Sequence, residues 1–256
     1  MLLCILTVHL MVTRGSALDL LTRELEIRIG QEAAPEVEGK YGGVLTDGRY
    51  VERVQRVGGK IVSVCDRKDI TYTFKVLNNE HWVNAISLPG GPIYITKRLM
   101  DMCETDEELA YVLGHEVAHI AKKHARKRIS EAILTNLAAS IFMPRDRLVR
   151  YGVTIAIALH ERGYSRQHER EADKYGVIYM MRAGYNPNGA IKVLQRFANM
   201  ERGKDDAITR LLRTHPHPKK RIEYVRKVIA KYGPKYGYTL DAIQSPKSQS
   251  GTECQH

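Results

Sequence analysis

The sequence predicts an α+β fold that is mostly helical and carries one small antiparallel sheet in its first half. Apolar residues recur at helical spacing in several segments on both sides of residue 100. Between residues 71 and 96, three short segments with strand-like patterns are instead separated by turn residues. At 256 residues, the chain is long enough to bury a substantial core as one domain with extensions.

The composition is ordinary except for its charge. Hydrophobic residues make up 43% of the chain and charged residues 27%, but the net charge is +11, with basic clusters at residues 122–128 and 219–227. No paired C-x-x-C motif or aromatic RNA-binding pattern accompanies these clusters. They therefore indicate a solvated basic face or attraction to anionic membranes and substrates rather than nucleic-acid binding. The four cysteines form no C-x-x-C motif, so a thiolate zinc site is not expected.

The first 17 residues resemble a secretory signal peptide. An apolar run at residues 2–12 is too short to span a bilayer, and small residues follow at 15–17. No basic residue precedes the run, so an N-terminal helix of the folded protein is the alternative. We expect export, a folded domain over residues 18–233 and a disordered tail over residues 234–256, where Ser, Lys, Gln, Gly and Pro are frequent.

Two helices are expected before the sheet. Residues 18–40 are charged and amphipathic, which predicts a surface helix that ends before Pro35. Residues 47–65 carry apolar side chains at helical spacing, although Gly58 and Gly59 weaken the pattern in the middle.

Three strands follow, at residues 71–77, 82–88 and 92–96, with a Pro-Gly-Gly turn between the last two. We expect them to form an antiparallel sheet directly before the next helix. An exposed edge of this sheet can bind an extended peptide as an added strand. Structural support alone is the alternative role.

The segment after the sheet carries the motif H-E-x-x-H. Thr105 and Glu108 form a capping box, and apolar residues at helical spacing predict a buried helix. Positions i and i+4 share one helix face, so His115 and His119 can direct ring nitrogens at one point, with Glu116 beside it. Two imidazoles and a carboxylate suit a zinc ion and a general base for its bound water. A buried histidine pair without a metal or other partner would be costly, which disfavours a purely structural role.

Two apolar runs lie beyond this helix. After a basic helical stretch at residues 122–130, residues 132–143 and 153–159 are apolar, with a break at 144–147. Neither run reaches the length of about 18 residues that a membrane-spanning helix requires. The runs could form a hairpin that covers the site or rests on a membrane, but packing in the core is the commoner explanation.

Residues 165–182 predict a second helix that contributes to the site. Ser165 suits the N-cap, and Gly184 suits the left-handed position after the C-terminus. Glu169 and Asp173 are spaced i, i+4, so Glu169 can complete a His/His/Glu zinc site that leaves a fourth position for water. Asp173 can accept the second N–H of a ligand histidine and fix its tautomer. A solvated acidic face balanced by neighbouring arginines is the alternative.

The rest of the chain predicts three more helices, at residues 186–202, 206–213 and 219–232. The last two are separated by Thr214-His215-Pro216-His217-Pro218. Two prolines in five residues make this turn rigid, so it should hold its histidines in fixed positions.

Four segments, in this order, resemble the M48 family of zinc metallopeptidases, which includes membrane-bound HtpX-like and Ste24-like proteases and soluble periplasmic relatives. They are Asn84-Ala85 with Leu88-Pro89-Gly90-Gly91, His115-Glu116-x-x-His119, Glu169-x-x-x-Asp173, and Thr214-His215-Pro216 with Arg221. The resemblance covers roughly residues 20–232 and is far more specific than H-E-x-x-H alone. It implies a zincin-like (gluzincin) metallopeptidase fold.

The resemblance also implies roles for the candidate residues. His115, His119 and Glu169 would bind one Zn²⁺ ion per chain, and Glu116 would be the general base of a zinc metalloendopeptidase. His215 matches a position that, in periplasmic relatives, can approach the zinc as a further ligand or stabilise the transition state.

The same resemblance indicates where the protein acts. The chain lacks the membrane-spanning helices of the HtpX-like members, which favours a soluble or peripheral-membrane protease of the periplasm or cell envelope. Unfolded or damaged proteins and peptides are the expected substrates, in protein quality control. No nucleic-acid partner is expected.

A competing interpretation is a zinc-containing binding or chaperone-like module for unfolded envelope proteins, with a latent site. His215 as a fourth protein ligand would close that site. Glu116 argues against it, because a purely structural site needs no adjacent base. A nucleic-acid binder would instead show strongly salt-dependent binding to DNA. The sequence leaves open whether Cys65 and Cys103 form a disulfide.

Overall fold

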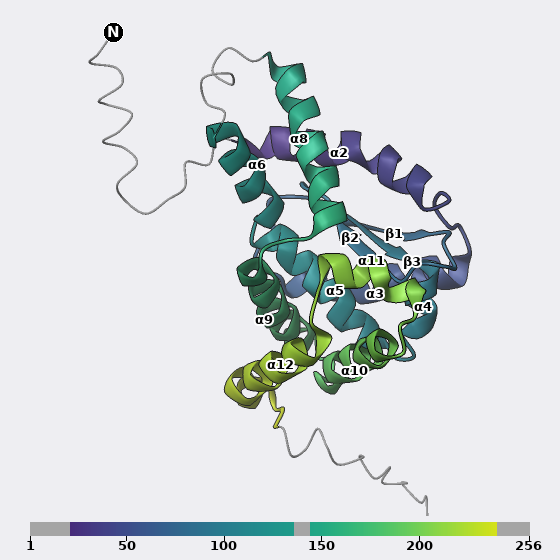
Figure 1. Ribbon diagram of the computed structural model, residues 1–256. Coiled ribbons are helices and arrows are strands. Elements are labelled where there is room, and N and C mark those ends of the chain that lie inside the picture. Colours follow the sequence, from purple (N-terminus) through teal and green to yellow (C-terminus); the bar gives the residue numbers. More distant parts are fainter. Residues whose placement is uncertain (1–20, 136–143, 240–256) are drawn as a thin grey trace, which may run out of the picture.

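The computed structural model describes residues 21–135 and 144–239. The expected signal peptide, part of the apolar run after residue 132 and residues 240–256 of the expected tail lie outside the described residues. Within them, helices surround one small three-stranded sheet, and the predicted mostly helical α+β fold is confirmed (Figure 1).

The first described helix, α2 (Arg23–Lys40), continues through Pro35, so the end predicted before that proline is wrong. Ile29, Ala33 and Val37 form a fully buried stripe along α2, which packs against α8 (Arg145–Arg162). Burying three apolar side chains stabilises the helix by several kcal/mol, about as much as an internal proline costs. Packing with distant elements, invisible in the local sequence, therefore sustains the helix.

Helix α3 (Gly48–Val64) matches its predicted range and begins at Asp47, whose carboxylate accepts a hydrogen bond from the Arg49 amide. Gly58, which weakened the prediction, allows a close contact. A Cβ atom at this position would lie 2.6 Å from the ring of Phe74 on the adjacent strand. The glycine lets the strand pack directly against the helix.

The sheet is mixed rather than antiparallel. Strands β1 (Thr73–Leu77) and β3 (Pro92–Thr96) pair in parallel, whereas β2 (Ala85–Ser87) pairs with β3 in antiparallel fashion, in the order β1-β3-β2. The tight turn between β2 and β3 enforces their antiparallel pairing. The longer connection between β1 and β2 leaves a gap between these two strands. β3 then occupies the gap and pairs with both of them. As a result, β2 lies at one edge of the sheet, beside α5.

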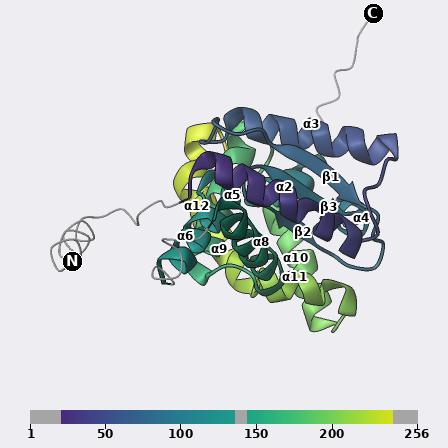
Figure 2. The same cartoon turned by 90° about the horizontal axis from the view of Figure 1, so that it is seen from above.

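Helices cover both faces of the sheet (Figure 2). Ile93 and Ile95 of β3 point into the main core with α3 and α5, whereas Tyr94 points into a second cluster with α2. This alternation follows the two-residue period of a strand.

The central helix is α5 (Asp106–Ala121), in which every residue from Glu108 to Ile120 is buried. Its N-terminus is capped as predicted, since the Thr105 hydroxyl accepts from the Glu108 amide at 3.3 Å. It is packed among the sheet and the helices α3, α9 and α10; the last two span Arg166–Arg182 and Asn188–Arg202. The short helix α4 (Lys97–Met102) precedes it.

Helices α6 (His124–Thr135) and α8 lie beside α2 at one end of the molecule (Figure 1). Pro144 is the N-cap of α8, so residues 145–147 of the predicted break belong to the helix. Among the described residues, no helix combines the length and apolar character needed to cross a bilayer.

The C-terminal part contains η1 (Asp206–Ile208), α11 (Thr209–Thr214), α12 (Pro218–Tyr232) and η2 (Gly233–Tyr236). Tyr236 and Tyr238 pack against the main core, and the Tyr238 amide donates to the Gly233 carbonyl at 3.0 Å. The boundary predicted at residue 233 therefore falls inside a packed segment. Cys65 and Cys103 are buried free thiols.

Candidate metal centre

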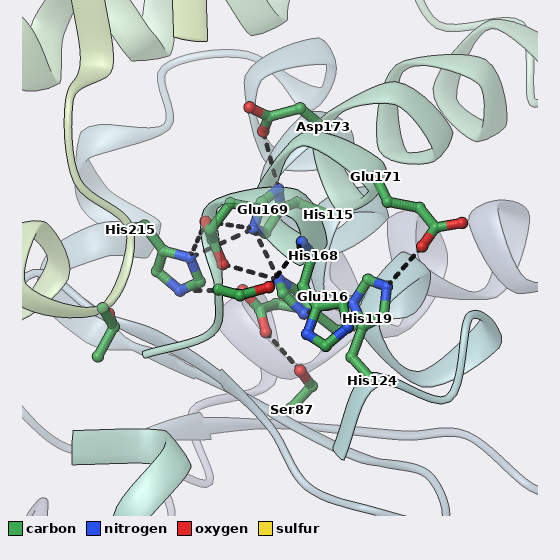
Figure 3. A network of polar contacts seen from close by, with 12 residues as sticks. Ser87, His115, Glu116, His119, His124, His168, Glu169, Glu171, Asp173 and His215 are labelled. Atoms are coloured by element: carbon green, nitrogen blue, oxygen red, sulfur yellow. Dashed lines mark hydrogen bonds and ion pairs between the residues drawn. The ribbon is translucent and has the colours of Figure 1, made fainter. Parts of the chain in front are cut away.

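Four buried side chains from three parts of the chain converge on one point (Figure 3). His115 and His119 come from α5, Glu169 comes from α9, and His215 follows α11. One potential ligand atom of each lies within 4.8 Å of the others. The structure thus brings together residues separated by up to 100 positions in the sequence.

The close crossing of α5 and α9 places Glu169 against the histidines. A Cβ atom at Gly114 would lie 2.9 Å from the Gly176 carbonyl oxygen, and one at Gly176 would lie 2.8 Å from the His115 nitrogen. Only glycines allow two helix backbones to approach so closely. The Glu169 carboxylate consequently reaches 3.5 Å from His115 Nε2 and 3.3 Å from His119 Nε2.

His215 faces the same point from the turn after α11. Its Nδ1 atom lies 2.8 Å from a Glu169 oxygen and 3.3 Å from His115 Nε2. On the other side of the ring, Nε2 lies 3.7 Å from a Glu116 oxygen. The ring therefore stands between the cluster and the predicted base.

Asp173 lies against the ring nitrogen of His115 that faces away from the cluster. The His115 Nδ1 atom lies 3.0 Å from Asp173 Oδ1, which also accepts hydrogen bonds from Tyr111 at 2.7 Å and from Arg221 at 2.7 Å. Burial alone would raise the pKa of Asp173, but the Arg221 charge and the His115 hydrogen bond outweigh it and hold that pKa well below its usual value. The ionised carboxylate accepts from Nδ1–H, so Nε2 is the His115 atom that faces the cluster.

A parallel arrangement holds His119. Its Nδ1 atom lies 2.9 Å from Nδ1 of the fully buried His124, whose Nε2 lies 3.1 Å from the Glu171 carboxylate. If the Glu171 carboxylate accepts the Nε2–H of His124, then Nδ1 of His124 carries no hydrogen and accepts the Nδ1–H of His119. The Nε2 atom of His119 then has a lone pair that faces the cluster. Tyr164 stacks on the His119 ring with centroids 4.2 Å apart. Burial lowers the pKa of His119 to about 3, which favours the neutral ring that a metal requires.

These donors fit a divalent metal ion. The Nε2 atoms of His115 and His119 lie 3.0 Å apart, and Glu169 Oε1 is buried without a hydrogen-bond partner. An orphaned carboxylate oxygen buried beside two imidazole nitrogens is unfavourable unless a cation lies between them. Nitrogen and carboxylate donors in this number are those of zinc sites.

Glu116, the predicted base, lies next to the cluster and points toward the sheet. One of its oxygens accepts a hydrogen bond from the Ser87 hydroxyl on β2 at 2.7 Å (Figure 3). This contact ties the carboxylate to the edge strand. It fixes the direction of the side chain beside the point where the histidines converge.

The structure brings every predicted site residue into one cluster, and it adds three that the sequence reasoning missed: Ser87, Tyr111 and His124. Glu171, which the sequence offered as the other possible ligand, faces His124 instead. Tyr111 stands one turn before His115, so helical spacing could have revealed it. His124 could have been noticed as a third histidine after the motif. Ser87 carries no such signal, because its position depends on how β2 packs against α5.

The fold is mostly helical, with an H-E-x-x-H helix at its centre and, on a neighbouring helix, one carboxylate that faces both histidines of the motif. This arrangement is that of metallopeptidases of the zincin-like class. The sequence model of the family described as "Peptidase family M48" matches residues 49–229. The chain therefore belongs to peptidase family M48.

Curated relatives agree with this family. The chain is 29% identical over 208 residues to "Mitochondrial metalloendopeptidase OMA1" of Schizosaccharomyces pombe, covering 79% of this chain and 60% of the relative. It is 35% identical over 159 residues to the protein of that name in Saccharomyces cerevisiae, covering 58% and 44%. It is 26% identical over 202 residues to "Putative beta-barrel assembly-enhancing protease" of Vibrio cholerae, covering 75% and 41%. The chain thus spans about half the length of these relatives.

Proposed function

We propose that this chain is a zinc-dependent endopeptidase in which Glu116 is the general base. The observation that carries the proposal is the position of Glu116, next to a buried His/His/Glu cluster and tied to β2 by Ser87. A purely structural metal site needs no carboxylate in that place. Family membership supports the same chemistry.

In this proposal, His115, His119 and Glu169 hold the metal, and Asp173 and His124 orient the two rings. Bound zinc would supply a Lewis acid that polarises the scissile carbonyl and acidifies water. Glu116 takes a proton from the attacking water and passes it to the leaving amine. Ser87 keeps the carboxylate aimed during both transfers.

The edge strand supports a way to bind substrate. β2 pairs with β3 on one side only and lies beside α5, so its other edge can pair with an extended peptide next to Glu116. Main-chain pairing is independent of side chains, which suits unfolded proteins as substrates.

We also propose a role in protein quality control of the cell envelope. The name of the Vibrio cholerae relative refers to assembly of β-barrels, and the first 17 residues resemble a signal peptide. The names of the two yeast relatives instead place those proteins in mitochondria, which is a second possible location for this chain. Peripheral contact with an anionic membrane is consistent with the net charge of +11.

The test measures bound zinc and hydrolysis of an unfolded protein such as reduced, alkylated lactalbumin. We expect about one zinc ion per chain, hydrolysis that a chelator abolishes, and recovery on adding zinc. The His115→Ala variant should lose both metal and hydrolysis. Hydrolysis that survives complete removal of metal would contradict the proposal.

The position of His215 favours a second candidate, a latent module for binding unfolded proteins. Its Nδ1 atom lies 2.8 Å from the Glu169 carboxylate, in the place of a fourth ligand that would close the site at rest. The same assay on His215→Ala separates the two possibilities. Faster hydrolysis with zinc retained would identify His215 as the group that closes the site, whereas slower hydrolysis would assign it to the reaction.

A further inference from the structure

A cavity of about 410 Å³ opens beside the candidate active site. It lies where the C-terminal end of α8, the helix α11 and the segment before β2 meet (Figure 1). His160 and Thr214 line both this cavity and the small cleft that contains Glu116 and His215. The cleft and the cavity are therefore neighbours, so a peptide bound along β2 would bring its next residues close to the cavity.

The cavity is strongly cationic. Lys40, Arg162, Arg210 and Arg213 line it, against the single carboxylate of Glu161. Lys40 already pairs with Glu161. Within the part of the chain that the structure describes, no carboxylate forms an ion pair with any of the three arginines.

Arg210 is held in position by aromatic rings. Its guanidinium lies 4.4 Å from the centroid of the Trp82 ring and 5.7 Å from that of Tyr41. Stacking leaves the edge of the guanidinium, with its N–H groups, free to donate. Arg213 follows three positions later on α11 and lines the same cavity, so two guanidinium groups face one cavity.

We propose that this cavity binds a carboxylate of the peptide substrate and thereby directs cleavage to acidic sequences. The inference rests on the proposed peptidase function. Two guanidinium groups that pair with no carboxylate among the described residues match the bidentate geometry of a bound carboxylate. The volume falls within the range of ligand sites, and the same charges repel lysine and arginine side chains of other peptides.

Trp82 makes the proposal testable without catalysis, because it is the only tryptophan in the chain and lines the cavity. Its fluorescence would be titrated in the full-length Glu116→Gln protein with three acetylated pentapeptides free of aromatic residues. One carries a central Glu and a C-terminal amide, one a central Gln and an amide, and one a central Gln and a free C-terminal carboxylate. The last two separate an internal side chain from a chain end as the source of the carboxylate.

We expect the Glu amide peptide to bind about tenfold more tightly than the Gln amide peptide, whereas tight binding of the free-carboxylate peptide alone would contradict a preference for acidic sequences. Arg213→Gln should remove most of this difference, because Arg213 is exposed on α11 and its loss leaves the core intact. Lys227→Gln is the matched control, since it removes one charge from an exposed site on α12 outside the cavity. It should preserve the difference.

Equal binding of all three peptides would overturn the proposal, as would equal loss in the Arg213→Gln and Lys227→Gln proteins. Inorganic phosphate that binds as tightly as the best peptide would mark a general anion site, which also contradicts it. Cleavage of matched Glu and Gln peptides by the parent protein then separates the two proposals. Hydrolysis of both at equal rates rejects the carboxylate site alone, whereas no hydrolysis of either the peptides or the unfolded protein rejects the peptidase function.

Discussion

His124 lies outside the H-E-x-x-H motif, yet it contacts His119 and so helps to shape the proposed metal centre. One ring nitrogen of His119 faces the cluster, and the other lies 2.9 Å from Nδ1 of His124. Lys123 lies just beyond the C-cap of α5 and has a left-handed φ of 58°, which turns the chain so that His124 returns to the His119 ring. The chain therefore supplies its own hydrogen-bond partner five positions after the ligand.

Replacing His124 should weaken metal binding through this contact. His124→Phe keeps the ring shape but removes the acceptor for His119 Nδ1–H, so we expect zinc affinity to fall about 10-fold to 100-fold. His124→Asn retains a side-chain acceptor and should recover part of the loss. Competition with a chelator of known affinity measures both variants, and the absorption spectrum of the cobalt-substituted protein reports the geometry. Unchanged zinc affinity in His124→Phe would show that the contact has no such role.

At the scale of elements, the crossing of α5 and α9 decides where the third ligand lies. Gly114 and Gly176 face each other with no room for a Cβ atom on either. The Glu169 and Asp173 side chains then reach the histidines from the first turns of α9. The geometry of the centre is thus set by two helix backbones in contact.

Gly176→Ala should separate the helices, because the new methyl group would lie 2.8 Å from the His115 nitrogen. We expect a loss of about 1–3 kcal/mol in the free energy of unfolding and weaker zinc binding. Gly59→Ala is the matched control, since Gly59 lies in α3 with no heavy atom within 4 Å of the added Cβ. An alanine there should stabilise the protein by about 0.5–1 kcal/mol. Urea unfolding of both variants decides the matter, and stabilisation by Gly176→Ala would refute the close crossing.

Local patterns could predict the parts of the site that lie on one helix turn. The i, i+4 spacing predicted that His115 and His119 act together, and likewise Glu169 and Asp173. The same reasoning failed for Ser87, because its contact with Glu116 depends on the strand order of the sheet. It also missed the parallel pairing of β1 and β3, since pairing between distant strands leaves no mark in either segment.

The whole molecule depends on contacts between segments far apart in the sequence. Glu26 of α2 forms a bidentate, fully buried ion pair with Arg67, which also donates to the Ile120 carbonyl near the end of α5 at 3.1 Å. These bonds tie the first helix to the helix that carries the metal ligands. No local pattern in either segment could predict these contacts.

Stability should fall in mild acid because of His160. Burial, and then the charge of Lys40, lower the pKa of this histidine from 6.5 to about 4. The unfolded chain therefore binds a proton at this histidine more readily than the folded chain does. The contribution of His160 to the free energy of unfolding is complete above pH 6.5 and is lost as the pH falls toward 4. Between pH 7.5 and 5, we expect a loss of about 2 kcal/mol from this group.

The measurement compares urea unfolding of the zinc-free parent and of His160→Gln at both pH values. Glutamine can keep a hydrogen bond to the Tyr41 hydroxyl, which lies 3.2 Å from His160 Nε2. The variant should lack this part of the pH dependence. Equal pH dependence in the two proteins would show that His160 is not held neutral in the folded state.

The central claim is that Glu116 performs proton transfer beside a metal held by other residues. The most direct measurement determines bound zinc and the rate of hydrolysis of an unfolded protein for the parent and for Glu116→Gln, prepared in parallel. Glutamine has nearly the same shape but cannot accept the proton. We predict equal zinc content and a loss of hydrolysis of about 100-fold or more. A zinc-loaded Glu116→Gln protein that cleaves at the parental rate would contradict the account.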